Sequence, residues 1–395
     1  MGRRVESGEE VLLLAPDLAD ALSAVRVAES DRERQAVFEF RYSVYVEELK
    51  RGVGTVDARR ARLHDPDDDE PGTTLLYTAG AGGSMTGTAR VRSWAPGAIP
   101  GEVAERFSTE SFTGIADLGT AELGRLMVRA DRRGRSELVS LLCAVYLFAE
   151  TELGTDLVFL TCLSGLVRYY RRVGFRSYAA DLVPTSDGVT VPMVLILSDR
   201  PYLDRVGSFL APLAGAFYAP GKHPPLDVRR WSDLLDGRAA PVELDPAAVW
   251  ERVQRLAGVT GAPSRFFDAL DADSIRKLSD CGFVMAVEAG QLLTKKGLVQ
   301  REMFVVLDGT FEIHDGDRRI GVVGPGEVIG EIGFFGTAQQ RSASVTALAP
   351  GHLLVLRRHW LDELRRSDPE RAADILFQLA RALADHVSAP SPTAP

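Results

Sequence analysis

A short stretch around Gly330 combines the residue types that bind a phosphate and a sugar. Gly330 and Gly333 allow the backbone to approach a ligand closely and to point its N–H groups at oxygen atoms. Glu331 supplies a carboxylate, which can accept a hydrogen bond from a sugar hydroxyl. Arg341 supplies a guanidinium, which can bind a phosphate through paired charge-assisted bonds. Because a cyclic nucleotide requires both contacts, the stretch predicts a cyclic nucleotide site.

The same residues resemble the phosphate-binding cassette of cyclic nucleotide-binding domains, in the form found in bacterial catabolite activator proteins. Gly330-Glu331 matches the ribose end, Arg341-Ser342-Ala343 matches the phosphate end, and a short helical segment is expected around Phe334-Phe335. The resemblance implies a β jelly roll with flanking helices and cAMP as the ligand. The binding residues that it implies are Gly330, Glu331, Ile332, Gly333, Arg341, Ser342 and Ala343. The alternative is a small β-barrel with glycine turns and one surface arginine.

A basic turn between a predicted strand and a predicted long helix is typical of a site for phosphate groups. The strand is expected over residues 123–128, the turn over 129–136, and the helix as far as Glu152. Backbone N–H groups at the start of the helix, together with the helix dipole and the arginines of the turn, can hold a pyrophosphate. The turn is therefore a second candidate site.

The order of the elements and four motifs resemble the GNAT acyltransferase fold, and within it the autoinducer synthases and the long-chain N-acyl amino acid synthases. The motifs lie at residues 40–45, 87–90, 122–128 and 169–175. The resemblance covers about residues 25–197 and implies a mixed sheet with helices and an acyl donor that is acyl-coenzyme A or acyl carrier protein. The donor-binding residues that it implies are Met127, Val128, Arg132, Arg133, Gly134, Arg135 and Ser136. The turn has Asp131 and Ser136 where the family favours Gln or Arg and Gly or Ala.

Acyl transfer to an amine requires a base for the amine and an acid for the leaving thiolate. Glu122 is the predicted base, because it begins the strand that leads into the basic turn. Its alternative role is an ion pair with Arg125 or Arg90 that shapes the pocket. The resemblance implies Tyr170 as the acid, and the alternative is a packed aromatic residue. The predicted catalytic residues are Glu122, Tyr170 and Arg125.

Two further arginines and an acidic run complete the candidate residues of this half. Arg41 and Arg90 are predicted to bind the carboxylate of the acceptor or to brace Glu122. The acidic run from Asp65 to Glu70 lies within residues 57–72, which we interpret as a solvated loop.

The length and composition suit two domains and a connector. The chain has 395 residues, of which 45% are hydrophobic. We predict an α+β protein with a GNAT-like acyltransferase domain over residues 1–200, a packed helical and Pro-rich connector over 201–258, and a cyclic nucleotide-binding domain over 259–395. The helical pattern over residues 360–386 is expected to cover the nucleotide.

Several classes of protein are disfavoured. The net charge of −9 argues against broad binding of nucleic acid, and the part after Val345 is too short for a winged helix beyond the covering helix. The N-terminus lacks the apolar core of a signal peptide, and no apolar run of roughly 18 residues occurs, so a cytoplasmic protein without a membrane span is expected. The cysteines Cys143, Cys162 and Cys281 form no CxxC or Cys/His cluster, so we expect buried, reduced thiols and no metal site.

These inferences predict an N-acyltransferase that is regulated by a cyclic nucleotide. It would move an acyl group from acyl-coenzyme A or acyl carrier protein to an amine, which is an amino acid, another small amine or a protein lysine. The alternative is a non-catalytic sensor of cyclic nucleotides, in which the acyltransferase-like half binds a ligand or partner without turnover.

Overall fold

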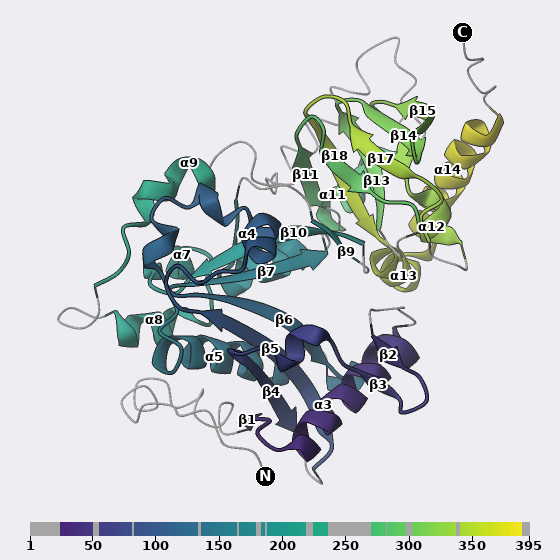
Figure 1. Ribbon diagram of the computed structural model, residues 1–395. Helices are drawn as coiled ribbons and strands as arrows, with labels where there is room; N and C mark the ends of the chain where they lie inside the picture. The colour runs from purple at the N-terminus through teal and green to yellow at the C-terminus, as the bar shows by residue number, and fades with distance from the viewer. Residues whose placement is uncertain are drawn as a thin grey trace. The chain divides into compact units, whose positions relative to one another are not determined.

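The structure is a computed structural model in which two compact units are distinguished, and each is described by itself (Figure 1). The first unit is built around an eight-stranded sheet and the second around two four-stranded sheets. The residues that the structure describes are 24–49, 55–80, 83–132, 136–163, 166–178, 183–185, 188–218, 224–235, 270–281, 283–297, 302–336 and 340–388.

The large sheet of the first unit is mixed. Its strand order is β1-β4-β5-β6-β7-β10-β8, with β9 paired to β10. The strands from β1 to β6 pair antiparallel, whereas β6 and β7 run parallel. The strands are β1 (Val25–Val27), β4 (Thr73–Ala79), β5 (Met85–Trp94), β6 (Thr120–Val128), β7 (Leu157–Leu163), β8 (Arg176–Ser177), β9 (Val183–Thr185) and β10 (Gly188–Ile196). The mixed sheet predicted for this half is confirmed.

Helices α3 (Asp31–Tyr42) and α5 (Ser136–Thr151) lie on opposite faces of this sheet. On one face, Leu75 and Tyr77 of β4 pack against α3. On the other face, the backbone of Gly87 on β5 lies against Leu141 of α5, and Gly87 is paired with Thr78 of β4. Since neighbouring residues of a strand point to opposite faces, the two helices are on different sides. Helix α3 begins with a capping box between Ser30 and Glu33.

The other short elements of the first unit surround the sheet. They are a π-helix η1 (Ser43–Glu48), strands β2 (Val56–Asp57) and β3 (Arg62–Leu63), 3-10 helices η2 (Pro66–Asp69), η3 (Thr109–Ser111), η4 (Ile115–Asp117) and η5 (Ala130–Arg132), and helices α4 (Gly101–Phe107) and α6 (Val167–Val173). Cys143 and Cys162 are buried, as expected, and burial raises the pKa of Cys143 to about 12. Among the described helices, none combines the length and apolar composition needed to cross a membrane.

Two irregularities of β6 shape the centre of the sheet. Thr88 and Arg90 of β5 oppose Met127 and Gly124 of β6, so β6 carries one extra residue, and Arg125 at the bulge has a left-handed φ of 49°. The described pairing of β6 with β7 ends at Glu122, opposite Phe159. Beyond this point β6 continues to Val128 and β7 to Leu163 without a described pair between them.

The described part of the predicted connector packs within the first unit. It contains α7 (Arg200–Arg205), α8 (Ala211–Phe217), η7 (Val228–Trp231) and α9 (Ser232–Leu235). Gly174 has a φ of 121°, and a Cβ there would lie 2.2 Å from Cδ2 of Leu203 in α7, so only glycine suits this position. Trp231 is buried, and its Nε1 donates to the carbonyl of Thr113 at 3.1 Å. The domain boundaries that we expect stay a prediction.

The second unit contains two antiparallel sheets with helices, and it confirms the predicted β roll with flanking helices. The strand orders are β11-β18-β13-β16 and β12-β17-β14-β15. The strands are β11 (Phe283–Val287), β12 (Leu292–Thr294), β13 (Glu302–Asp308), β14 (Phe311–Asp315), β15 (Arg318–Val323), β16 (Val328–Ile329), β17 (Ser344–Ala347) and β18 (Gly351–Arg357). The helices are α11 (Ala272–Cys281), α12 (Glu331–Phe335), α13 (Arg358–Ser367) and α14 (Pro369–Ser388).

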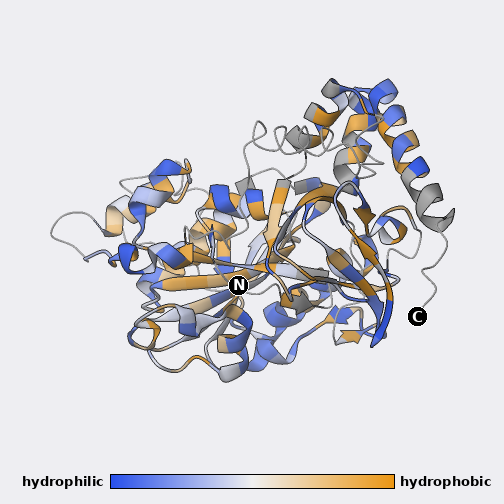
Figure 2. Ribbon diagram, turned by 90° about the horizontal axis from the view of Figure 1, so that it is seen from above, coloured by the Kyte–Doolittle hydropathy of each residue, from blue (hydrophilic) through white to orange (hydrophobic). Residues whose placement is uncertain are grey.

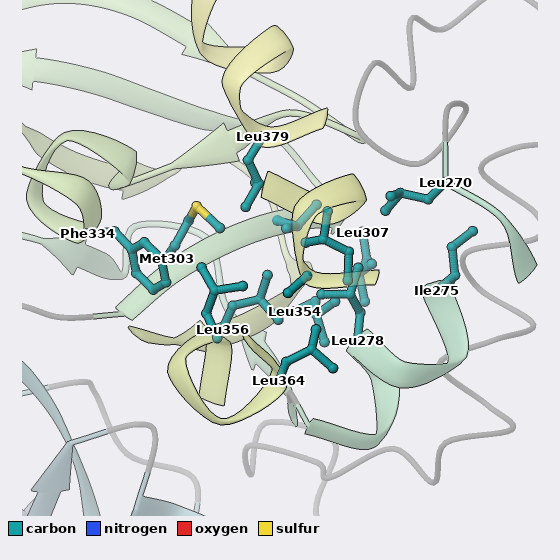
Figure 3. Packing of buried hydrophobic residues seen from close by; sticks show 14 of the residues in the cluster. Leu270, Ile275, Leu278, Met303, Leu307, Phe334, Leu354, Leu356, Leu364 and Leu379 are labelled. Atoms are coloured by element: carbon teal, nitrogen blue, oxygen red, sulfur yellow. The ribbon is translucent and has the colours of Figure 1, made fainter. Parts of the chain in front are cut away.

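The core of this unit lies between the first of these sheets and the helices. Figure 3 shows Leu354 and Leu356 of β18 and Met303 of β13 directed toward Leu364 of α13 and Leu379 of α14. Hydrophobic and hydrophilic residues are interspersed along the terminal helices, which is the pattern of helices with one buried face (Figure 2). The region predicted to be helical over residues 360–386 consists of two helices, because Pro369 cannot continue a helix that precedes it.

Candidate functional site

Charged side chains converge on the face of the first sheet that carries α3. In the pairing of β4 with β5, Arg90 lies opposite Leu75 and Arg92 lies opposite Thr73. Leu75 packs against α3, so both arginines point to that face. Glu122 of β6 lies opposite Arg92 and points the same way. The three side chains therefore share one face of adjacent strands.

These side chains belong to an arginine–carboxylate cluster whose formal charges cancel, five against five. The cluster consists of Arg41, Arg90, Arg92, Arg106, Arg125, Asp65, Asp67, Asp68, Glu70 and Glu122.

The acidic run that we interpret as a solvated loop is solvated only in part. Asp69 and Glu70 are exposed, but Asp65 and Asp68 are buried in this cluster, so for these two residues the interpretation is wrong. Nη1 of Arg41 donates to both oxygens of Asp68, at 2.9 and 2.8 Å, and both side chains are 0% exposed. Burial by itself would raise the pKa of Asp68, but the Arg41 guanidinium and the backbone N–H of Asp65 outweigh it and hold that pKa below its usual range. The carboxylate is therefore held in its charged form.

Asp65 joins this pair to β5 and β6. Its carboxylate accepts two hydrogen bonds from Arg125, at 2.6 and 2.8 Å, and one from Arg90 at 3.3 Å. The bulge explains the first contact, because the left-handed backbone at Arg125 turns its side chain toward the face on which Asp65 lies. Arg90 also donates to Asp67 at 3.0 Å.

Glu122 pairs with two arginines that differ from the expected partners. Oε2 accepts from Nη1 of Arg92 at 3.1 Å, and Oε1 accepts from Nη1 of Arg106 at 3.0 Å. In the described part of the chain, Glu122 has no ion pair with Arg125 or Arg90, and neither Arg41 nor Arg90 braces it. Sequence reasoning missed both partners, although Arg92 stands two residues after Arg90 on the same strand face.

The remaining predicted residues of the acyltransferase site lie nearby in the fold or outside the described residues. Tyr170 lies in α6, where its ring contacts Tyr169 and Phe175. Met127 and Val128 are buried residues of β6. Arg133, Gly134 and Arg135 lie outside the described residues, and Arg132 and Ser136 are described only as the end of η5 and the start of α5. The predicted roles of all these residues stay predictions.

Asp131, which departs from the family pattern, has a charged partner within the turn. Its carboxylate accepts two hydrogen bonds from Arg129, at 2.6 and 3.0 Å. Arg129 therefore neutralises the negative charge of Asp131, which would otherwise repel a phosphate group at this turn.

The predicted phosphate-binding cassette surrounds Arg341 in the second unit. Gly330 has a φ of 87° and caps α12 (Glu331–Phe335), which includes the helical segment expected around Phe334-Phe335. Arg341 is buried and donates from Nη1 to the carbonyl of Gly330 at 2.7 Å and from Nη2 to the carbonyl of Glu302 at 2.6 Å. A Cβ at residue 330 would lie 1.8 Å from Nη1 of Arg341, so the cassette requires glycine there.

The cassette gathers the predicted nucleotide-binding residues in one place. Burial lowers the pKa of Arg341 to about 10, although the carboxylates of Glu302 and Glu331 oppose this shift. Ile332 and Ser342 are exposed, whereas Gly333 is buried and Ala343 is half-buried. The arrangement places the buried guanidinium of Arg341 close enough to the half-buried carboxylate of Glu331 for their charges to interact.

Two family models match separate parts of the chain. Residues 36–199 match the model described as N-acyl amino acid synthase FeeM, and residues 284–368 match the model described as cyclic nucleotide-binding domain. No curated protein sequence matches the chain. The chain therefore joins an N-acyl amino acid synthase-like domain to a cyclic nucleotide-binding domain.

Several solved structures are similar to parts of the chain. The structure of FeeM, an N-acyl amino acid synthase from uncultured soil microbes, is 15% identical, with coverage of 48% of this chain and 96% of that chain and a TM-score of 0.36. The N-terminal domain of a transcriptional regulator from Streptomyces coelicolor A3(2) is 30% identical, with coverage of 33% and 93% and a TM-score of 0.28. A cyclic nucleotide-binding domain from Methylobacillus flagellatus KT is 21% identical, with coverage of 35% and 78% and a TM-score of 0.30.

The buried pair of Arg41 and Asp68 generates a prediction about stability. Asp68→Asn should destabilise the protein by about 3–5 kcal/mol at neutral pH, because it leaves the Arg41 charge buried without a partner. The pKa of Asp68 is lowered in the folded state, so its stabilisation is complete above the usual carboxyl range and is lost as the pH falls through the lowered value. The difference between wild type and variant should therefore shrink on acidification, as measured by urea unfolding at several pH values.

The exposed neighbour Asp69, which pairs with Arg34, provides the matched control for this experiment. Asp69→Asn should change the free energy of unfolding little at any pH, because exposed ion pairs contribute little. Equal losses from the two variants, or a gap for Asp68→Asn that does not change with pH, would contradict the prediction.

Proposed function

We propose that the chain is an N-acyltransferase that moves an acyl group from a thioester donor to an amine, and that cAMP regulates it. The observation that carries this proposal is the position of Glu122. Its buried carboxylate lies where the pairing of β6 with β7 ends, within the segment that matches the N-acyl amino acid synthase model. A base is needed at such a point, between an acyl donor and an amine.

The donor in this proposal lies along β6 beyond Glu122. An extended thioester arm can pair there as a further strand would, through backbone hydrogen bonds. Its phosphate groups then reach the turn before α5, where residues 132–136 are the candidates for holding them. This geometry suits acyl-coenzyme A and acyl carrier protein alike, because both carry the thioester on the same type of arm.

The reaction divides between two groups. Glu122 takes one proton from the acceptor ammonium, and the amine nitrogen then attacks the carbonyl carbon of the thioester. The C–N bond forms and the C–S bond breaks. Tyr170 gives its proton to the departing thiolate and is restored by the second proton of the amine. Arg125 and Arg90 hold the segment around Asp65 that forms a wall of the site. Arg41 is enclosed with Asp68, so of the two arginines predicted to contact an acceptor carboxylate Arg90 is the remaining candidate.

The regulatory site in this proposal is the cassette of the second unit. Glu331 accepts a hydrogen bond from the ribose, and Arg341 and Ser342 bind the cyclic phosphate. Backbone groups of Gly330, Ile332, Gly333 and Ala343 complete the site. The support is the match of residues 284–368 to the cyclic nucleotide-binding model, together with a guanidinium that two carbonyls already hold at the cassette.

A non-catalytic sensor is the second candidate function. The observation that favours it is that both oxygens of Glu122 accept hydrogen bonds from guanidinium groups in this structure. A general base must have a carboxylate oxygen that the amine can reach, so two occupied oxygens favour a sensor without turnover. A measurement of acyl transfer therefore decides between the two candidate functions.

The first test replaces the proposed base. Glu122→Gln should lower the rate of acyl transfer by about a hundredfold or more while the affinity for the donor is kept, because a positioned base is worth about that much. The rate is measured as free thiol released from acyl-coenzyme A or acyl carrier protein in the presence of amines. Glu70→Gln is the matched control, since it also removes a carboxylate from Arg92 but leaves the proposed base in place. Equal loss of activity in both variants would assign Glu122 a structural role.

The second test concerns the cassette. Arg341→Ala should weaken cAMP binding by roughly ten- to a hundredfold, because a lost charge-assisted bond costs about 1.5–3 kcal/mol. Calorimetry with cAMP and with cGMP measures the affinity and the preference for the base. Arg319→Ala, which removes an exposed arginine of β15 paired with Glu312, is the control. Unchanged cAMP affinity in Arg341→Ala would exclude this cassette as the binding site.

The third test concerns regulation. If cAMP changes the affinity for the acyl donor, the donor must change the affinity for cAMP by the same factor, which is typically about five- to 150-fold. Calorimetry of cAMP with and without saturating donor measures this factor, and the rate is assayed with and without cAMP. Unchanged affinity together with an unchanged rate would mean that the two domains act independently.

A further inference from the structure

The two cations on Glu122 differ in how firmly they are held. Arg92 is 2% exposed and also pairs with Asp67 at 3.2 Å and with Glu70. Arg106 is 30% exposed, and in the described part of the chain Glu122 is its one ion-pair partner. Moving Arg92 would break its contacts with three carboxylates at once and leave Glu70 without its described ion-pair partner, whereas the guanidinium of Arg106 can move into water at little cost. Arg106 is therefore the exchangeable cation.

The backbone that carries Arg106 is fixed even though its side chain reaches solvent. Arg106 stands in the last turn of α4, beside Phe107, which is fully buried. The ring of Phe107 lies 5.3 Å from that of Phe159, the residue of β7 opposite Glu122. The helix is thus anchored at the point where β6 and β7 cease to pair, and only the long arginine side chain needs to move.

We propose that Arg106 is a positioning residue that occupies Oε1 of Glu122 until the ammonium group of the acceptor replaces it. The proposal rests on the proposed function, in which Glu122 is the base, and it assigns the amine to Oε1 while Arg92 keeps Oε2. One cation replaces another, so the buried carboxylate is never without a counter-charge. The ammonium then gives Glu122 the proton that the reaction requires.

The exchange makes the pH dependence of the reaction a specific readout. The charged groups that face Glu122 are Arg92 on β5 and Arg106 on α4, and Asp67 and Glu70 lie behind Arg92. Removal of the Arg106 charge disfavours the ionised carboxylate in the free enzyme. In the complex, the acceptor ammonium supplies the missing charge. When the Arg106 charge is removed, the acid limb of the pH profile of kcat/KM should therefore move to higher pH, whereas the acid limb of the pH profile of kcat should stay in place.

The experiment uses Arg106→Met in the full chain. The KM for the amine should fall about tenfold, because the amine no longer competes with a guanidinium whose pairing is of modest strength. Arg106→Lys keeps a cation and should retain the wild-type acid limb. Arg62→Met is the matched control, since Arg62 is 31% exposed and pairs with the single carboxylate of Glu39. Thermal unfolding of each variant reports whether the fold is kept.

A second measurement separates failure of this proposal from failure of the proposed function. Butylammonium, which is protonated at neutral pH, should bind Arg106→Met more tightly than wild type in calorimetry, and this readout needs no turnover. If wild type is inactive but butylammonium shows this difference, the acyltransferase proposal fails and the exchange at Glu122 stands. If wild type is active but the KM, the acid limb and butylammonium binding are unchanged in Arg106→Met, Arg106 only anchors α4 and the exchange is overturned.

Discussion

The ion pair between Arg41 and Asp68 organises the N-acyl amino acid synthase-like domain, because two enclosed charges can be stable only together. Arg41 lies on the helix that covers the sheet, and Asp68 lies in the short segment before β4. Their pairing brings Asp65 within reach of Arg125, and through Asp67 it extends to the arginines of β5. Glu122 stands at the far end of this chain of contacts. A shift in one member would therefore disturb the geometry of the others.

The two domains hold their key arginines in different ways. In the N-acyl amino acid synthase-like domain, carboxylates accept the hydrogen bonds of the arginines and cancel their charges. In the cassette, backbone carbonyls of Gly330 and Glu302 orient Arg341 without a full opposing charge at the hydrogen bond. The first arrangement suits a rigid wall, and the second would suit the phosphate contact that we propose for Arg341.

Short-range signals in the sequence are enough to indicate individual helices, whereas the charged contacts of the candidate site depend on residues that are far apart in the chain. The capping box at Ser30 and the helix after Gly330 depend on residues within a few positions, so they could be predicted. Asp65 pairs with Arg125, which lies 60 residues away in the sequence. Neither a hydrophobic periodicity nor a motif in the acidic run indicates that contact. Arg106 was missed for the same reason, since it lies outside every motif of the resemblance. The left-handed backbone at Arg125 also has no glycine to indicate it.

The balance of five positive and five negative groups has a consequence for the approach of the substrates that we propose. A neutral set of charges produces little field beyond its own dimensions, and mobile ions screen what remains within roughly 10 Å at moderate salt. If substrates bind here as we propose, the cluster would discriminate between them only on contact, through the direction and length of hydrogen bonds. Any strong effect of ionic strength on the rate of encounter would have to originate elsewhere on the surface of the domain.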